Sequence, residues 1–429
     1  MKIYKYPNND TWKTLSERPV IKQNTLDEIV SGILYEVKSS KDKAIKNLTK
    51  RFDGITIENL KVSRSEIENA ESLVCTDLKN AITVAKSNIE TFHLTQNTNE
   101  AISETMEGIQ CWRKNIGIEK VGLYIPGGSA PLFSTVLMLG IPAIIAECKE
   151  IVLCSPPDKN GKINPAILYA ANLIGISKIF KVGGAQAIAA MAYGTETIPQ
   201  VYKIFGPGNQ FVTKAKELVQ QSGIAIDMPA GPSEVLIIAD NTGNPEFIAA
   251  DLLSQAEHGA DSQVILISDN EDIINQTSKA LEKQLSELPR KEIATKALEN
   301  SRSILLENLE SCFEFSNTYA PEHLILASDN GEQFISSITN AGSVFIGNYS
   351  CESAGDYASG TNHTLPTNGF AKNYSGVSVD SFVKKITFQK LTAKGISNIG
   401  PAIEIMAEAE ELYAHKNAVT LRLKSLQNV

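Results

Sequence analysis

The sequence predicts an α/β fold built on parallel sheets, and two observations support this prediction. Short β-branched runs alternate with longer helical periods between Val121 and Gln221, and the alternation returns between Glu234 and Ile346. Strands that alternate with helices of about ten to fifteen residues indicate right-handed crossovers and a parallel sheet. The 429 residues also suffice for two or three domains of about 150 residues each.

The first α/β set starts at Val121. Its expected strands cover 121–125, 151–154, 178–182 and a short stretch near Ile204, and its expected helices cover 133–147, 165–174, a segment opening at 184–186 and a segment that follows 206–209 and ends near Gln221. The apolar run from Leu137 to Ala146 contains Pro142. It is much shorter than the roughly 20 residues of a membrane span, so we expect a buried helix there.

The second α/β set starts at Glu234. Its expected strands cover 234–238, 263–267, stretches near Ile304 and Leu324, and 343–346, and its expected helices cover 245–258 and 272–287. Before Val121 the chain looks mostly helical and polar, with helices expected over 26–51 and 64–91. After Ser381 we expect a strand over 383–388 and a helix over 401–413.

The segment 347–377 is rich in Gly, Ser, Asn, Thr and Pro and has no periodicity. A structureless loop of more than about 15 residues inside a compact domain is usually functional or disordered. This segment contains Asp356 and His363, and their presence favours a functional loop over a flexible surface insertion.

Composition excludes several classes of partner. There are 40 Lys plus Arg against 49 Asp plus Glu, the net charge is −9, and the longest basic run is the pair Lys384-Lys385. We therefore expect neither nucleic acid nor a membrane surface as a partner. The six cysteines form no Cys-x-x-Cys pair, and the N-terminus lacks the apolar core of a signal peptide. Both features are typical of a cytoplasmic protein with reduced thiols.

Histidine is scarce in this chain, and its placement is therefore informative. Of the five histidines, four lie in segments dense with other metal-binding or proton-transferring side chains: His258, His323, His363 and His415. The alternative is that the histidines are scattered at random, but the placement of four of the five in such segments favours a reaction centre. His93 has no such neighbours, so we expect it to be structural or exposed.

A metal site is predicted around one helix end. Gln255 and His258 lie three residues apart near the end of an expected helix and so share a face. With Asp356 and His415 they form a set of nitrogen and oxygen ligands compatible with zinc. The alternative is that Gln-x-x-His is a capping or surface feature.

Glu322 and His323 form a candidate acid–base pair. They follow Ala320-Pro321 and lead into the expected strand at Leu324, which places two proton-transfer groups at the rim of the sheet. Adjacent side chains point in opposite directions along an extended chain, so the pair needs separate roles or a bend. An exposed polar pair at a strand start is the alternative.

Two further features bear on chemistry. The pairs Gly127-Gly128, Gly183-Gly184, Gly206-Pro207-Gly208 and Gly231-Pro232 mostly lie at expected strand exits, which fits ligand binding at the carboxyl edge of an open sheet. The Gly-x-Gly-x-x-Gly fingerprint is absent, and each pair could be a tight turn. Cys111 precedes Trp112-Arg113-Lys114, but this single cationic context does not favour a thiol nucleophile.

Taken in order along the chain, the motifs resemble the histidinol dehydrogenase family over almost the whole length. The resemblance is carried by the segments 122–128, 182–187, 204–209, 226–234, 253–259, 321–324, 353–363 and 415–419. It implies a four-electron oxidation of L-histidinol to L-histidine through histidinal, with two NAD molecules. This reaction forms the last steps of histidine biosynthesis, on a homodimer with one zinc per active site.

The resemblance also implies residue roles. The zinc ligands are Gln255, His258, Asp356 and His415, and the acid–base residues are Glu322 and His323. The substrate contacts are Ser233, His363 and Glu410 together with His323 and the four zinc ligands, and the cofactor contacts are Tyr124, Gln186 and Asn209.

The fold implied by the resemblance is α/β, with two incomplete Rossmann-like lobes on parallel sheets and small N-terminal and C-terminal helical segments. The expected divisions are an N-terminal segment 1–20, a discontinuous first lobe of 21–120 and 233–378, a second lobe of 121–232, and a C-terminal segment of 379–429. That last segment reaches the partner subunit, where Glu410 and His415 complete the neighbour's site.

Two rival functions are weighed against this one. A relative that oxidises another polar alcohol is disfavoured by His363, Glu410 and Ser233, because a site built to hydrogen-bond an imidazole and an amine rejects ligands that lack them. A two-lobed binding protein is disfavoured because such proteins are commonly exported, and because Glu322 and His323 would have no purpose in it.

Overall fold

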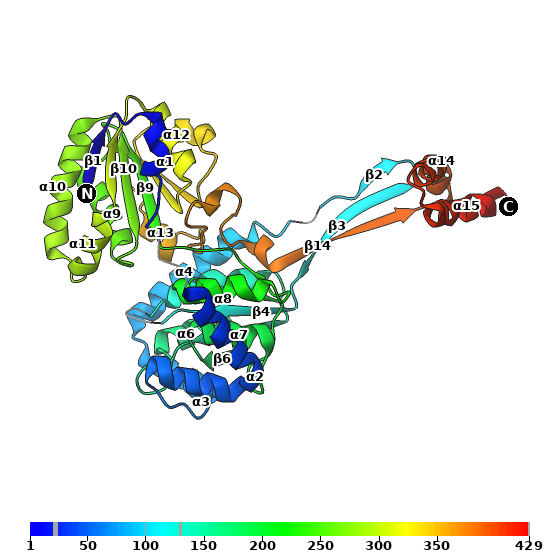
Figure 1. The fold of residues 1–429 in the computed structure, drawn as a ribbon, viewed down its shortest axis with the longest axis horizontal. Helices are drawn as coiled ribbons and strands as arrows, with labels where there is room; N and C mark the ends of the chain where they lie inside the picture. The colour runs from blue at the N-terminus through cyan, green and yellow to red at the C-terminus, as the bar shows by residue number, and fades with distance from the viewer. Residues whose placement is uncertain (20–24, 99, 128–130, 428–429) are drawn as a thin grey trace.

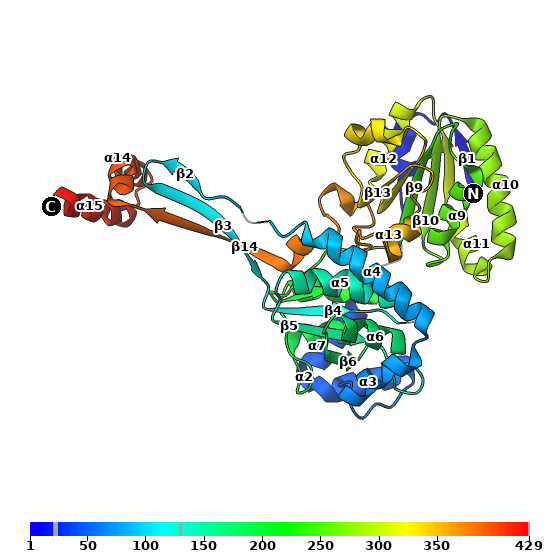
Figure 2. The ribbon, with the colours of Figure 1, turned by 180° about the vertical axis from the view of Figure 1, so that it is seen from behind.

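The computed structural model describes residues 1–19, 25–98, 100–127 and 131–427. Two α/β lobes lie side by side, and a long arm extends from them to the C-terminus (Figure 1, Figure 2). Gly128 of the first glycine pair lies outside the described residues. The arrangement confirms the predicted α/β class with parallel sheets.

The first lobe contains a six-stranded parallel sheet in the order β1-β11-β10-β9-β12-β13. The strands are β1 (Lys2–Lys5), β9 (Glu234–Ala239), β10 (Gln263–Ser268), β11 (Arg302–Leu305), β12 (His323–Ala327) and β13 (Ser343–Ile346). The helices are α1 (Asn9–Leu15), α9 (Pro245–Ala256), α10 (Glu271–Glu287), α11 (Lys291–Glu299), α12 (Leu309–Tyr319) and the 3-10 turn η1 (Gly331–Ser337). The strand order reverses between β9 and β12, as in Rossmann-type sheets.

The second lobe contains a five-stranded parallel sheet in the order β6-β5-β4-β7-β8. The strands are β4 (Lys120–Tyr124), β5 (Glu150–Ser155), β6 (Lys178–Lys181), β7 (Lys203–Phe205) and β8 (Ala225–Ile226). The helices are α2 (Leu26–Asp53), α3 (Arg64–Leu73), α4 (Thr76–Leu94), α5 (Phe133–Ile145), α6 (Pro165–Leu173), α7 (Gly184–Tyr193) and α8 (Gln210–Gln220). The order again reverses beside the first strand of the set, between β4 and β7.

Local sequence explains where these elements begin. β9 and β10 are buried along their whole length, as their uninterrupted apolar runs predict for central parallel strands. Asn244 and Asn164 cap helices that start with proline, and each asparagine side chain accepts an N–H of the first turn. α5 is buried from Ser134 to Ala143, which confirms the predicted buried helix.

The region before Val121 is mostly helical, as expected, and it also contains the strands β1, β2 (Ser103–Met106) and β3 (Ile109–Gly117). Two other local expectations were wrong. The expected helix over 64–91 is two helices separated at Val74 and Cys75. The segment 347–377 is not structureless, because it forms α13 (Glu352–Tyr357) and the 3-10 turns η2 (Phe370–Lys372) and, just beyond, η3 (Val379–Phe382).

The packing of the N-terminal helices differs from the expected division. Residues 21–120 were assigned to the first lobe, but α2 buries Val30, Leu34 and Val37 in one core with α7 and α8 of the second lobe. α3 and α4 pack with α5 and α6 on the opposite face of the same sheet. In addition, β1 pairs with β11, so residues 1–20 are not a separate segment. Amphipathic helices carry no sequence signal for which sheet they will cover.

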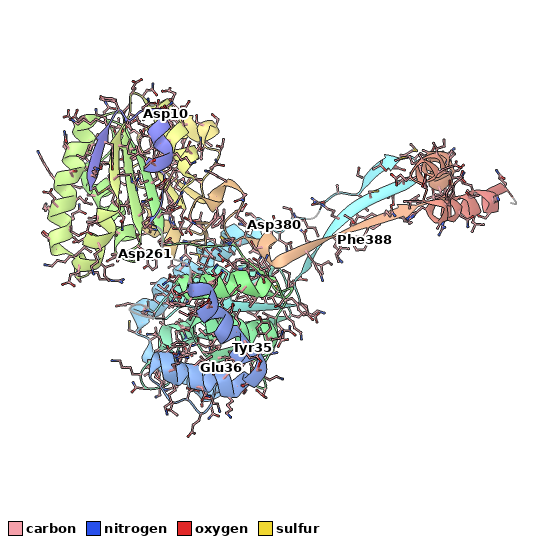
Figure 3. All side chains as sticks on the ribbon, viewed as in Figure 1. Asp10, Tyr35, Glu36, Asp261, Asp380 and Phe388 are labelled. Carbon is pink, nitrogen blue, oxygen red and sulfur yellow. The ribbon has the colours of Figure 1, made fainter. Side chains whose placement is uncertain are left out.

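The arm consists of an antiparallel sheet in the order β14-β3-β2 and two helices. β14 covers Val383–Leu391, α14 covers Ala393–Ala409 and α15 covers Tyr413–Gln427. Figure 3 shows Phe388 on the arm and Asp380 where the arm leaves the lobes. The helix expected over 401–413 corresponds to α14, which starts earlier than expected, contains Pro401 and ends before Tyr413. None of the described helices has the length and apolar content to cross a membrane.

Candidate functional site

The first cluster of polar groups lies at the amino edge of the first sheet, where β9 and β12 begin. His323 Nδ1 lies 3.6 Å from Glu322 Oε2, although the two residues are adjacent in sequence. The turn before them makes this possible, because Ala320 adopts a left-handed φ of 56° and Glu322 precedes the strand. The side chains therefore face the same space, and the bend anticipated from the sequence is present.

The main chain of Glu234 holds both members of this pair. Its N–H donates to Glu322 Oε2 at 2.9 Å, and its carbonyl oxygen lies 3.3 Å from His323 Nδ1. A donor at Nδ1 leaves Nε2 as the nitrogen that faces the rest of the site. Within the described part of the chain, this buried Nε2 has no hydrogen-bond partner. It is therefore available to a ligand.

A group of three potential metal ligands lies next to His323. His258, just beyond the end of α9, and Glu352 and Asp356, on α13, each place a ligand atom within 4.8 Å of the others. Among the described residues, the buried atoms Glu352 Oε2 and Asp356 Oδ1 have no hydrogen-bond partner. Unpartnered buried carboxylate oxygens are costly, and nitrogen and oxygen donors suit a zinc ion. The residues present therefore fit a divalent cation.

Electrostatics in this cluster are dominated by burial and by close carboxylates. Burial and the neighbouring acidic groups raise the pKa of Glu352 well above its ordinary value, although His323 opposes this. Burial favours neutral His323, yet Glu352, Glu322 and Asp356 together raise its pKa well above the ordinary value. Burial acts to raise the pKa of Asp356, but its contact with His323, at 3.5 Å from Nε2, lowers it. The three neighbouring carboxylates thus favour the protonated form of His323.

Gln255 lies on α9 one turn before His258 and is almost fully buried. With its amide oriented to suit its neighbours, the nitrogen donates to Glu352 and the oxygen accepts from the Glu234 N–H at 2.9 Å. The structure therefore places Gln255, His258 and Asp356, three of the four predicted ligands, around Glu352.

His363 connects this cluster to the second lobe. Its Nδ1 lies 2.9 Å from the Asp356 carbonyl oxygen, and its Nε2 lies 3.1 Å from Thr135 Oγ1 of α5. Burial lowers the pKa of His363 despite the nearby Asp356. His93 is buried, and its Nδ1 lies 2.8 Å from the Ile89 carbonyl oxygen, which agrees with the structural role predicted for it.

The remaining predicted site residues are distributed differently. Ser233 precedes Glu234 and so lies at the same sheet edge. Glu410 and His415 are exposed residues at the tip of the arm, away from α13 (Figure 1, Figure 2). Within one chain they do not join the cluster.

Two acidic residues of the site were missed by sequence reasoning. Glu352 lies four residues before Asp356, a spacing that places both on one face of a helix, and this signal was hidden by the expectation of a loop. Glu234 opens an apolar strand, and its carboxylate is held by two hydrogen bonds from Arg18, at 2.7 and 2.9 Å. A charge at the start of a buried strand was the available signal.

A cavity of about 590 Å³ lies at the carboxyl edge of the second sheet. Its walls include the three predicted cofactor contacts Tyr124, Gln186 and Asn209. The Gly184 N–H donates to Tyr124 Oη at 3.1 Å, and burial raises the pKa of Tyr124 to about 12. Asn209 caps α8, while α7 begins at Gly184, so two helix N-termini border the cavity. Its volume is within the roughly 300–1,000 Å³ of ligand pockets, and such helix ends favour phosphate groups.

Two Rossmann-like lobes, an acid–base cluster between them and a cavity at a sheet edge define an α/β enzyme. The sequence model described as histidinol dehydrogenase matches residues 16–423. A histidinol dehydrogenase of Bacteroides thetaiotaomicron is 58% identical over 427 residues, covering 100% of both chains. The Escherichia coli histidinol dehydrogenase is 52% identical over 418 residues, which cover 97% of this chain and 95% of that protein. The chain belongs to the histidinol dehydrogenase family and is an oxidoreductase.

Solved structures agree with this assignment. The crystal structure of histidinol dehydrogenase from Elizabethkingia anophelis is 63% identical, with a TM-score of 0.98, and the match covers 100% of this chain and 99% of that one. An acetylating aldehyde dehydrogenase from Geobacillus thermoglucosidasius has a TM-score of 0.50 at 15% identity, which indicates likeness of fold alone.

Proposed function

We propose that this protein oxidises L-histidinol to L-histidine through histidinal, using two NAD molecules and a bound zinc ion, in the last steps of histidine biosynthesis. Family membership supports the substrate. The observation that carries the proposal is the convergence of Glu322, His323 and Asp356 beside His258, with three buried polar atoms left for a ligand.

The donor set supports a zinc ion held by Gln255, His258 and Asp356, with His415 as the fourth ligand. When bound, zinc would hold the amine and imidazole of histidinol, and NAD would accept the hydride. Glu352 accepts a hydrogen bond from the Gln255 amide nitrogen and so orients that amide. Such supporting groups typically matter about 10- to 100-fold for metal affinity.

His323 Nε2 is the atom that removes the alcohol proton. Glu352, Glu322 and Asp356 together raise the pKa of His323 in the metal-free site, and a cation bound at this cluster would offset their negative charge. A neutral imidazole would present its unprotonated Nε2 to the substrate, while the Glu234 carbonyl keeps Nδ1 in place. A base of this kind contributes about 10²- to 10⁴-fold to a rate.

Glu322 serves the second oxidation. Its carboxylate is anchored through Oε2 to the Glu234 N–H. It takes a proton from water as that water adds to the aldehyde, and His323 acts again as the resulting diol is oxidised. Three proton transfers thus use two adjacent groups, and His323 releases the first proton before it acts again.

The cavity of the second lobe is the proposed NAD site. Tyr124, Gln186 and Asn209 line it, and the two helix N-termini suit the pyrophosphate. His363 and Thr135 connect the cluster to α5, which follows β4 of the cavity-bearing sheet. This link supports hydride transfer between the acid–base cluster at one sheet edge and the NAD cavity at the other.

The arm supports a homodimer with shared sites. Ile386, Ile405, Met406 and Leu412 are exposed apolar residues on it, and exposed apolar surface of this kind marks interaction sites. We propose that the arm of one subunit brings Glu410 and His415 to the cluster of its partner. All six cysteines are free thiols, which supports a cytoplasmic location.

The decisive experiment is product analysis after incubation with L-histidinol, NAD and zinc, while reduced nicotinamide is followed by absorbance. We expect L-histidine and two reduced cofactors for each substrate. Reduction with other alcohols but not with histidinol would favour a relative of different specificity. No reduction with any alcohol would favour a binding protein.

The metal and acid–base assignments have separate tests. His258→Asn should reduce zinc content after dialysis, whereas Glu257→Gln, at the neighbouring position, should not; full occupancy in the first variant would refute the ligand assignment. Glu322→Gln should impair histidinal oxidation more than histidinol oxidation. Equal losses in the two half-reactions would contradict a water-activating role.

A further inference from the structure

Part of the wall of the cavity in the second lobe is apolar. Ile29, Ile33, Phe52 and Ile55 line it, and Ile29 and Phe52 are 47% and 48% exposed. Large apolar side chains left open along a cavity wall are expected where a flat ligand group covers them. On the proposed function, which this inference takes as its basis, the adenine ring of NAD is that group.

Asp53 directly follows Phe52 of this apolar part of the wall. It is the last residue of α2, followed by Gly54 in the left-handed conformation, and it lines the same cavity. A carboxylate at a helix C-terminus opposes the helix dipole. Asp53 is exposed to solvent, although partial burial of its carboxyl group raises its pKa. Among the described residues, this carboxylate has no hydrogen-bond or ion-pair partner. Its placement therefore does not serve the stability of the helix.

Two other charged residues line the cavity in the described part of the chain, and their surroundings differ from those of Asp53. Asp158 Oδ1 accepts the N–H groups of Asn160 at 2.8 Å and Lys162 at 2.9 Å, so this carboxylate shapes its own loop. Lys159 offers a positive charge for the pyrophosphate. Among the described residues of the wall, Asp53 is therefore the charged residue left to accept neutral hydroxyl donors of a ligand.

We propose that Asp53 binds the adenosine ribose hydroxyls of NAD and excludes the 2′-phosphate of NADP. Two adjacent hydroxyls can donate to the two oxygens of one carboxylate, which forms charge-assisted hydrogen bonds. A phosphate on the 2′-oxygen removes one donor and brings like charges together. The residue thus sets cofactor specificity from the end of a helix, in a lobe that lacks the glycine-rich fingerprint.

The test is titration calorimetry of the full-length protein with NAD, NADP and the hypoxanthine analogue of NAD, in the absence of histidinol. Asp53→Asn should reduce the preference for NAD over NADP by about tenfold or more. Asp158→Asn removes the same charge from the same wall but keeps an acceptor oxygen for its loop. That control should retain the wild-type preference.

Two results would overturn the assignment. An unchanged ratio of NAD to NADP affinity in Asp53→Asn would exclude the ribose contact. A selective loss of discrimination between NAD and its hypoxanthine analogue would mean that the carboxylate binds the adenine amino group instead. If the wild-type protein binds no dinucleotide, both the proposed function and the role of Asp53 are wrong. If the wild-type protein binds NAD, the Asp53→Asn result tests the role of Asp53 alone.

Discussion

The two lobes share a strand order but use opposite edges of their sheets. The first lobe gathers Glu322, His323 and the potential metal ligands at the amino edge, where β9 and β12 begin. The second lobe opens its cavity at the carboxyl edge, beyond β4 and β5. The comparison shows that strand order alone does not decide which edge of a parallel sheet carries chemistry.

Helix polarity matches each edge to the ligand proposed for it. α9 and α12 end at the amino edge of the first sheet, so their partly negative carbonyl ends point toward the cluster. α7 and α8 begin at the carboxyl edge of the second sheet, so their N–H groups point toward the cavity. One edge therefore suits a cation and the other an anionic cofactor.

The largest expected effect separates the two edges functionally. His323→Asn should lower kcat by about 10²- to 10⁴-fold because it removes the proton acceptor, while the Kd for NAD, measured by calorimetry, stays at the wild-type value. A parallel loss of NAD affinity would mean that the two edges form one inseparable site.

Each lobe also contains a buried ion pair, and breaking each one sharpens the comparison. Arg18 binds Glu234 in the first lobe, and Lys216 binds Asp227 in the second. Arg18→Met and Lys216→Met should each lower the free energy of unfolding by about 3–5 kcal/mol, because each leaves a buried carboxylate without its partner. Urea titrations measure this loss.

The functional consequences of these two variants should differ. Glu234 holds Glu322 and His323 through its main chain, so Arg18→Met should lower kcat. Lys216 donates to the Gly206 carbonyl oxygen at 3.0 Å, in the loop that leads to Asn209, so Lys216→Met should weaken NAD binding. The reverse pattern would contradict the division of labour between the lobes.

A smaller effect concerns pH and the helix that carries Gln255. Asp251 lies one turn earlier on α9, and burial raises its pKa to about 7. The folded protein therefore keeps this proton when the unfolded chain has released it, and stability falls as pH rises from about 4 to about 7. Asp251→Asn should remove that fall. At pH 8 its free energy of unfolding should exceed that of the wild type by roughly 1–3 kcal/mol, which appears as a higher urea midpoint.

This pH experiment is best done with chelator present, comparing urea midpoints at pH 5 and pH 8. The variant should gain on the wild type at both values, and the gain should be larger at pH 8 than at pH 5. An equal gain at both values would assign the effect to packing rather than to the proton.

The smallest effect compares two helix caps. Asn209→Ala and Asn244→Ala remove the caps of α8 and α9, and each should cost about 1 kcal/mol of stability. Only Asn209 lines the cavity, so only its loss should weaken NAD binding. Equal NAD affinities in the two variants would exclude a role for Asn209 beyond capping.

By itself, the sequence determined the parallel α/β class and the positions of the strands from Val121 to Ile346, because hydrophobic periodicity is a local property. It also singled out Gln255, His258, Glu322, His323 and Asp356, since scarce imidazoles and their acidic neighbours are visible in one dimension. The family resemblance added Tyr124, Gln186 and Asn209, which line one cavity.

Only the tertiary structure decided which sheet α2, α3 and α4 would cover, because an apolar helix face is compatible with either core. It also decided that Glu352 joins His258 and Asp356, and that Arg18 compensates Glu234. These contacts join residues far apart in sequence, and burial fixes them only once both partners have lost water. Charge balance in a buried site is a property of the assembled neighbourhood, which no local pattern encodes.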